Sequence, residues 1–345
     1  MSTIGITMGC PASIGPEIIL KYFSIPPTTS ANITPVVLGD TTVLEKCAKE
    51  LGFNDVRIIP WAVGTELPER SVNVIPVLSL SNLKDAEITW GTPTPETAMA
   101  MAHYITEGVR LAQEGILDGI TTCPISKFSL NQAGFSFPGH TEMLADLTAS
   151  KDYAMMMAGD RLRVTLATIH CALATVPKAL SKASIIQLIE TTYNALSIDL
   201  DIESPNIAVA ALNPHCGENL LFGTEEQTTI EPAVNEARLK GISVDGPFPP
   251  DTIFFKAAQG DYDAVVCMYH DQGLIPFKLL HFNDGVNITL GLPIVRTSVD
   301  HGTAYDIAGT GIADPSSLSC AIELAGRISA NRKTDAKKRK TSNEL

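Results

Sequence analysis

Short apolar runs alternate with longer segments of helical spacing along most of the chain, and this alternation most constrains the fold. The expected strands cover residues 33–40, 56–60, 72–78, 119–122, 163–168, 206–212 and 264–269. The expected helices begin near Pro16 and cover residues 42–51, 94–114, 176–196 and 228–240. Helices that alternate with short apolar strands predict an α/β architecture in which most strands are parallel.

Composition excludes several other classes of protein. The chain has 345 residues, of which 45% are hydrophobic and 18% charged, a profile typical of a globular α/β protein. Its apolar runs, such as Ile207–Leu212, are too short to span a bilayer. Lys21 is the first basic residue, and Pro11 and Pro16 interrupt any apolar region of a signal peptide, so we expect a cytoplasmic protein.

Charge and cysteine usage narrow the range of partners. The net charge of −13 argues against nucleic acid as a partner. The seven cysteines are scattered without the dense spacing of a disulfide scaffold, which favours a reducing compartment. Residues 331–345 hold six Lys or Arg against two acidic residues, a local charge of +4. Because this end has almost no apolar residues to bury, we predict a solvated, disordered tail; a basic docking segment is the alternative.

Three histidines lie where a ligand site would be expected. His170 ends the run RVTLATIH, His215 follows the run IAVAAL, and His270 follows AVVCM. The carboxyl ends of parallel strands share one edge of a sheet, so these histidines can converge. Three neutral imidazoles suit Zn²⁺ or another borderline divalent metal, and Asp251 and Asp271 could complete or support the site. Each histidine alone is more often a structural residue.

Two further sets of residues bear on the site: cysteines as rival metal ligands, and polar residues that suit an anion. Cys171, Cys216 and Cys267 lie close to them in sequence, but their spacing is irregular and lacks a Cys-x-x-Cys pair, which disfavours thiolate ligands. A second, polar set of residues suits a phosphate or carboxylate, and it comprises His140, Thr141, Lys278, Asn287 and Arg296. Asn287 and Arg296 stand within apolar stretches, where an unpaired polar group is costly.

A glycine-rich segment, HGTAYDIAG, begins at His301 and would let the backbone approach a ligand closely. No G-x-G-x-x-G motif follows an expected strand, so the common dinucleotide-binding fold is not supported.

Together these motifs resemble the 4-hydroxythreonine-4-phosphate dehydrogenase family of pyridoxal phosphate biosynthesis. The matching blocks include ITMGCPASIGPEI, TTCPISK, FPGHTE, TLATIH, NPHCGE, PPDT, MYHDQG and GVNITLGLPIVRTSVDHGTA, in the order of the family, from near the N-terminus to about residue 315. The stretch HGTAYDIAGTGIADP also looks like the cofactor loop of isopropylmalate and isocitrate dehydrogenases.

The resemblance implies a two-domain, isocitrate/isopropylmalate dehydrogenase-like fold with mixed, mostly parallel sheets flanked by helices. One domain would comprise residues 1–125 and 285–330, with the cofactor loop, and the other residues 126–284. It implies a homodimer with its site at the subunit interface. The implied divalent-metal ligands, for Zn, Mg or Co, are His170, His215 and His270. The implied substrate-binding residues are His140, Thr141, Lys278, Asn287 and Arg296, and the implied NAD or NADP contacts are His301, Gly302, Ala304 and Asp306.

The implied reaction is the oxidation of 4-phosphooxy-threonine with NAD(P)⁺, followed by decarboxylation to 3-amino-2-oxopropyl phosphate. Lys278, His140 and Asp251 are candidate proton carriers, and sequence does not rank them. Two residues depart from the family's first loop, GDPAGIGPE: Cys10 replaces Asp and Ser13 replaces Gly. These changes put a ligand contact of this loop in doubt. Cys123, which replaces Ala in the family's TAPxxK loop, has no obvious chemical consequence.

Three alternatives stay open at the level of sequence. The nearest is a dehydrogenase of D-threonate or D-erythronate 4-phosphate, whose substrate carries a hydroxyl in place of the amine. A zinc hydrolase using the three histidines and Asp251 would release product without NAD⁺. A phosphate- or metal-binding module without catalytic activity would leave the HGTAYDIAG segment unexplained.

Overall fold

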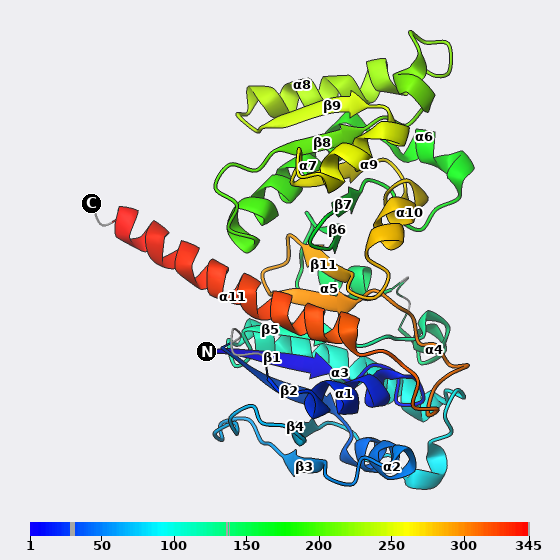
Figure 1. The fold of residues 1–345 in the computed structure, drawn as a ribbon, viewed down its shortest axis with the longest axis vertical. Helices are drawn as coiled ribbons and strands as arrows, with labels where there is room; N and C mark the ends of the chain where they lie inside the picture. Colours follow the sequence, from blue (N-terminus) through cyan, green and yellow to red (C-terminus); the bar gives the residue numbers. More distant parts are fainter. Residues whose placement is uncertain (28–31, 136, 138, 344–345) are drawn as a thin grey trace. The chain divides into compact units, whose positions relative to one another are not determined.

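The computed structural model describes residues 1–27, 32–135, 137 and 139–343 (Figure 1). The chain divides into two compact units, each of which draws on two stretches of sequence. Unit 1 comprises Met1–Ser150 and Leu292–Ala330, and unit 2 comprises Lys151–Gly291 and the residues from Asn331 onward.

Unit 1 is built on a parallel sheet. Its strands are ordered β3-β4-β2-β1-β5-β12, and every neighbouring pair is parallel. The strands are β1 (Ser2–Thr7), β2 (Ile33–Gly39), β3 (Arg57–Pro60), β4 (Val74–Ser79), β5 (Gly119–Thr122) and β12 (Arg296–Val299). The central strands β2 and β5 are buried along their whole length, as expected when helices cover both faces of a parallel sheet.

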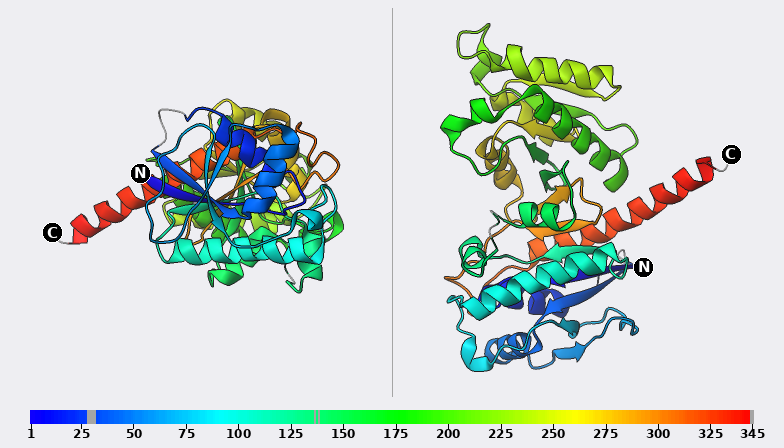
Figure 2. Two further views of the ribbon diagram at one scale, coloured as in Figure 1. Left: turned by 90° about the horizontal axis from the view of Figure 1, so that it is seen from below. Right: turned by 180° about the vertical axis from the view of Figure 1, so that it is seen from behind.

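Side-chain caps start several helices of unit 1. The Asp40 carboxylate accepts hydrogen bonds from the backbone N–H groups of Thr42 and Val43 and starts α2. Thr94 forms a capping box at the start of α3, the long helix that packs against β1 and β5 (Figure 2). The helices are α1 (Gly15–Ser24), α2 (Thr41–Leu51), η1 (Asp85–Glu87), α3 (Pro95–Gln113), α4 (Lys127–Gln132), α5 (His140–Leu147) and α11 (Ser316–Asn343), whose last residues belong to unit 2.

Unit 2 is built on a mixed sheet, ordered β11-β6-β7-β10-β8-β9. The strands β7, β10, β8 and β9 are parallel, whereas β6 is antiparallel to both β11 and β7. The strands are β6 (Ala154–Ala158), β7 (Arg163–Leu166), β8 (Ile207–Ala210), β9 (Val244–Phe248), β10 (Ala264–Cys267) and β11 (Val286–Leu290). A buried cluster that includes Met157, Val164, Val265 and Phe277 forms a core on one face of this sheet.

The helices of unit 2 connect these strands, and α7 packs along α8 (Figures 1 and 2). They are η2 (Leu173–Thr175), α6 (Val176–Ala179), α7 (Lys182–Asn194), η3 (Ala195–Asp199), η4 (Pro214–Gly217), η5 (Glu226–Ile230), α8 (Glu231–Leu239), α9 (Pro250–Ala258) and α10 (His270–Leu280). Within the described residues, no helix combines the length and apolar character needed to cross a membrane.

The predicted α/β class with mostly parallel strands is confirmed. The expected domain bounds differ from the two units: residues 126–150 belong to unit 1, and the chain returns to unit 1 at Leu292 rather than at residue 285. These differences arise because α4 and α5 contact α3, and because β11 pairs with β6.

The predicted disorder of residues 331–345 is wrong for residues 331–343, which continue helix α11. The physical reason is an anchor that composition does not reveal. The Arg332 guanidinium forms a two-pronged ion pair with the Asp199 carboxylate, at 2.6 and 2.8 Å, and Asn331 Nδ2 donates to the Asp199 carbonyl at 2.9 Å. Residues 344–345 of this prediction lie outside the described residues.

Candidate functional site

The three histidines of the expected metal site all belong to unit 2 and follow neighbouring strands. His170 lies beyond the end of β7, His215 lies in η4 after β8, and His270 is the first residue of α10 after β10. In the sheet these strands are adjacent, in the order β7-β10-β8, and they are parallel. Their carboxyl ends therefore share one edge, as the sequence pattern predicts.

Two of these histidines are neighbours in space. The ring centroids of His170 and His270 are 5.9 Å apart, and His270 Nδ1 lies 2.7 Å from Asp271 Oδ1. A carboxylate on Nδ1 leaves Nε2 of His270 as the nitrogen available to a metal. Among the described residues, no three His, Cys, Asp or Glu side chains are grouped closely enough to hold a metal ion. His215 therefore does not join the pair in this arrangement.

His215 lies on a left-handed turn. Consecutive residues from His215 to Leu220 have positive φ angles between 42° and 77°. For residues other than glycine this conformation costs roughly 1–2 kcal/mol each. The turn is supported by the buried Glu226 carboxylate, which accepts hydrogen bonds from the N–H groups of Leu212, at 2.8 Å, and Asn213, at 2.7 Å. Backbone strain concentrated in one loop is typical of functional sites.

The remaining candidates of unit 2 lie on four elements. Asp251 is in the first turn of α9, and Lys278 in the last turn of α10, with its ammonium 5.8 Å from the Phe282 ring centroid. Asn287 is on β11, and its buried Oδ1 has no hydrogen-bond partner among the described residues. Burial raises the pKa of the Cys267 thiol, so a thiolate ligand at this position is disfavoured.

Arg296 is the most deeply placed charged residue among the candidate substrate residues of unit 1. It is the first residue of β12, is 2% exposed, and its guanidinium donates to Thr122 Oγ1 at 2.8 Å. Burial lowers the pKa of Arg296 to about 9, and the nearby Glu142 carboxylate partly opposes this shift. A buried cation of this kind is costly, and an anionic ligand would relieve that cost.

His140 and Thr141 begin helix α5, as the Gly-turn pattern predicts. Burial lowers the pKa of His140 well below its usual value, and the positive charges of Arg296 and Lys127 lower it further. The imidazole is therefore neutral at pH 7, and its Nε2, shielded from solvent, has no partner among the described residues. Thr141 is 8% exposed.

Two residues of this region were missed at the sequence level. Thr122 and Lys127 both belong to the block TTCPISK, whose position after an apolar strand was the available signal. Thr122 receives the Arg296 hydrogen bond, and Lys127 lies beside Gly139, where its Cε is 3.4 Å from the position of an added Cβ. The block therefore contributes polar groups to the same part of unit 1.

The candidate cofactor segment lies within residues 301–313 of unit 1. His301 Nδ1 lies 3.1 Å from the Gly302 carbonyl oxygen, Ala304 has a φ of +42°, and Asp306 is exposed. A Cβ placed on Gly302 would have no atom within 4 Å, so this backbone faces open space. This openness suits the close approach of a ligand to the backbone.

The first loop, between β1 and α1, keeps contact with this segment despite its two departures from the family. Ser13 Oγ donates to the Cys10 carbonyl at 2.7 Å and accepts from Gly15 N–H at 3.2 Å, which closes the turn into α1. Cys10 is fully buried, and its sulfur accepts a hydrogen bond from the Tyr305 hydroxyl at 3.3 Å. The first loop therefore contacts the candidate cofactor segment through the neutral side chain of Cys10, not through a charged group.

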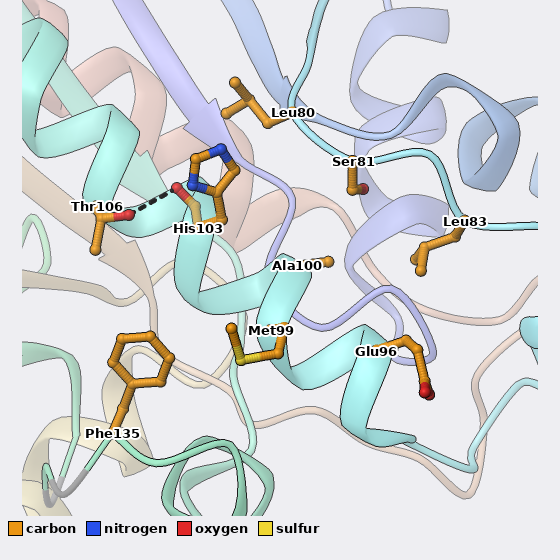
Figure 3. Close-up of a pocket in the computed structure, with 9 residues that line it drawn as sticks. All are labelled: Leu80, Ser81, Leu83, Glu96, Met99, Ala100, His103, Thr106 and Phe135. Carbon is orange, nitrogen blue, oxygen red and sulfur yellow. Dashed lines mark hydrogen bonds between the residues drawn. The ribbon is translucent and has the colours of Figure 1, made fainter.

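A separate pocket of about 360 Å³ in unit 1 is lined by residues of α3 and the loop after β4 (Figure 3). His103 points into this region, and its carbonyl accepts the Thr106 hydroxyl at 3.0 Å. The pocket lining contains none of the residues that the sequence predicts for metal, substrate or cofactor.

Known proteins similar to this chain agree on one family. A family model described as pyridoxal phosphate biosynthetic protein PdxA matches residues 31–325. The chain is 53% identical over 323 residues to a 4-hydroxythreonine-4-phosphate dehydrogenase of Desulforapulum autotrophicum, which covers 93% of this chain and 94% of that protein. A relative from Oceanobacillus iheyensis, 42% identical over 93% of this chain and 97% of its own, carries the provisional name D-threonate 4-phosphate dehydrogenase.

Solved structures agree with these sequence matches. The crystal structure of a 4-hydroxythreonine-4-phosphate dehydrogenase from Klebsiella pneumoniae has a TM-score of 0.84 and 40% identity, and covers 95% of this chain and 100% of that one. A terephthalate 1,2-cis-dihydrodiol dehydrogenase from Burkholderia xenovorans has a TM-score of 0.65 at 27% identity, over 94% of this chain and 98% of that one. The family model, the sequence identities and the shared fold together establish that this chain belongs to the PdxA family of pyridoxal phosphate biosynthetic proteins.

Proposed function

We propose that this chain oxidises 4-phosphooxy-L-threonine with NAD⁺ or NADP⁺ and that the product then loses CO₂ to give 3-amino-2-oxopropyl phosphate. One observation carries the proposal: identity of 53% over more than nine-tenths of both chains to a relative named 4-hydroxythreonine-4-phosphate dehydrogenase. The buried cation Arg296 supports it, because a desolvated guanidinium suits a phosphorylated substrate.

The histidines fit a divalent metal in part. The 5.9 Å between the ring centroids of His170 and His270 is short enough for two bonds of about 2.1 Å to one ion. This distance supports His170 and His270 as ligands, and the family resemblance adds His215, so we assign these three as the residues that would hold Zn, Mg or Co, with Asp271 orienting His270. A bound ion would supply Lewis acidity to the substrate's hydroxyl oxygen.

The substrate-binding residues of the proposal are His140, Thr141, Lys278, Asn287 and Arg296. Arg296 supplies a cation that is already desolvated, so its attraction to a phosphate or carboxylate is stronger than that of a surface arginine. The unpartnered Oδ1 of Asn287 accepts a hydrogen bond, which suits a substrate hydroxyl or ammonium group.

The reaction divides into two balanced steps. The carbon that bears the hydroxyl loses a hydride to the nicotinamide ring, and the hydroxyl proton passes to a base. The resulting β-keto acid then releases CO₂, and the carbon that carried the carboxylate takes up a proton. His140, Lys278 and Asp251 are the candidates for moving these protons, although burial and two neighbouring cations disfavour protonation of His140.

The cofactor residues of the proposal are His301, Gly302, Ala304 and Asp306. The open backbone at Gly302 supports this assignment. We further propose that the enzyme is cytoplasmic, because seven free thiols suit a reducing compartment, and that it is a homodimer, as the family resemblance implies.

The test is an assay of NADH formation with metal present, using 4-phosphooxy-L-threonine and, separately, D-threonate 4-phosphate. We expect NADH and CO₂ from the first substrate and loss of both when a chelator removes the metal. NADH formation that is insensitive to chelation would overturn the metal assignment, and product without NAD⁺ would point to a hydrolase.

A second candidate function is the oxidation of D-threonate 4-phosphate. The provisional name of the Oceanobacillus iheyensis relative, at 42% identity, favours it. Turnover only with the sugar-acid phosphate would select this function over the first.

A further inference from the structure

We propose that Tyr305 is a positioning residue for the nicotinamide cofactor and that it acts through a hydrogen bond to Cys10. The inference rests on the proposed function, which assigns the neighbouring residues His301, Gly302, Ala304 and Asp306 to the cofactor. It concerns a contact between two of this chain's own residues, the Tyr305 hydroxyl and the Cys10 sulfur.

The segment around Tyr305 is held at its far end by helix α1. The buried Glu17 carboxylate, 1% exposed, accepts hydrogen bonds from the N–H groups of Gly311, at 3.2 Å, and Ala313, at 2.7 Å. The Lys21 ammonium donates to the carbonyl oxygens of the same two residues, at 2.7 and 2.6 Å. Four bonds from one ion pair therefore fix residues 311–313.

The near end of the segment is held less tightly. Ile14 N–H donates to the Thr303 carbonyl at 3.3 Å, a long bond. Ala304 adopts a left-handed φ of +42°, which is unfavourable for a residue with a Cβ. The backbone at the expected cofactor contacts therefore depends on a side-chain contact to keep its conformation.

Tyr305 supplies that contact. Its hydroxyl donates to Cys10 Sγ at 3.3 Å, and the Ser126 and Ser129 hydroxyls at the start of α4 also lie within hydrogen-bonding reach. Burial raises the pKa of Tyr305 and that of Cys10, so both groups are neutral and the bond is O–H to sulfur. One phenol thus connects the cofactor segment, the first loop and the helix that carries Lys127.

The backbone of Tyr305 is closely packed against Gly91. Gly91 has a φ of +76°, and a Cβ there would lie 2.6 Å from the Tyr305 carbonyl oxygen. Gly91 N–H also donates to the Ala12 carbonyl at 2.8 Å, which ties this loop to the first loop. The backbone of Tyr305 therefore lies directly against the loop that holds Gly91, and that loop is hydrogen-bonded to the first loop.

The test compares the apparent KM for NAD⁺ with kcat in Tyr305→Phe, Cys10→Ala and Cys10→Ser. A neutral hydrogen bond contributes about 1 kcal/mol, so Tyr305→Phe and Cys10→Ala should each raise the KM for NAD⁺ about fivefold and leave kcat nearly unchanged. Cys10→Ser keeps an acceptor and should restore the wild-type KM. The double variant Tyr305→Phe/Cys10→Ala should be no worse than either single change.

Tyr262→Phe is the matched control, because Tyr262 is a half-buried tyrosine of unit 2 that packs on Phe248. It should leave the KM for NAD⁺ unchanged. Direct titration of NADH fluorescence measures cofactor affinity without turnover. If wild type binds NADH and oxidises neither substrate, the proposed function fails and the affinity comparison still tests Tyr305. If Tyr305→Phe binds NADH as tightly as wild type, the inference is overturned.

Discussion

The His140 imidazole is a base whose surroundings disfavour its protonation, and this predicts a pH dependence of stability. Burial, Arg296 and Lys127 hold its pKa in the folded chain well below 6.5, the value of an exposed histidine. Between these two pKa values the unfolded chain binds a proton that the folded chain does not. The free energy of unfolding therefore falls as the pH drops below about 6.5, by at most about 1.4 kcal/mol per pH unit.

His140→Gln removes this titration. Urea unfolding of both proteins between pH 5 and about pH 7 measures the difference. We expect the variant to lose less stability than wild type on acidification. Equal slopes in the two proteins would show that His140 titrates normally in the folded chain.

Replacement of Arg296 should affect stability and substrate binding in opposite directions. Arg296 is 2% exposed, and its buried charge carries a desolvation cost that an apolar side chain of similar size does not. We expect Arg296→Met to unfold at a similar or higher urea concentration than wild type. The same change should raise the KM for the phosphorylated substrate at least about tenfold, since a charge-assisted bond contributes about 1.5–3 kcal/mol. Arg161→Met, at an exposed position, is the control and should change neither quantity.

At the scale of elements, the last part of helix α11 is held by the ion pair between Arg332 and Asp199. The Asp199 carboxylate is 7% exposed and is paired with Arg332, which is itself 26% exposed. Arg332→Met leaves this carboxylate buried without its cation, and we expect a loss of about 2 kcal/mol in the free energy of unfolding. Lys337→Ala, at an exposed position of the same helix, should change it by less than about 0.5 kcal/mol. Equal stabilities of the two variants, measured by urea unfolding, would contradict the anchor.

The same helix shows what sequence reasoning could and could not find. The spacing of apolar residues and the positions of Gly and Pro located most strands and helices. The strand Gly119–Thr122 is an example, because buried parallel strands carry apolar runs. These patterns missed the helical end of α11, because its order depends on Asp199, a residue more than 130 positions away. The left-handed turn from His215 to Leu220 was equally hidden, since only Gly217 within it favours that conformation.

At the scale of the whole molecule, the candidate residues divide between the two units. Strand order could be inferred only in part: the parallel strands β7, β10 and β8 were expected, but the antiparallel insertion of β6 was not. The placement of the histidines at strand ends was predictable, because it follows from parallel topology. The neutrality of His140 was not, because it arises from burial near two cations distant in sequence.

This division predicts that a bound metal stabilises unit 2, because His170, His215 and His270 all belong to it. A ligand that binds only the folded state at a hundred times its Kd stabilises that state by about 2.7 kcal/mol. Hydrogen–deuterium exchange with and without Zn²⁺ should therefore show protection in the loops that follow β7, β8 and β10, including the strained turn at His215. His270→Ala should abolish this protection, whereas His103→Ala, an exposed histidine of unit 1, should retain it. Protection confined to unit 1, or unaffected by His270→Ala, would contradict the assignment of the three histidines to the metal.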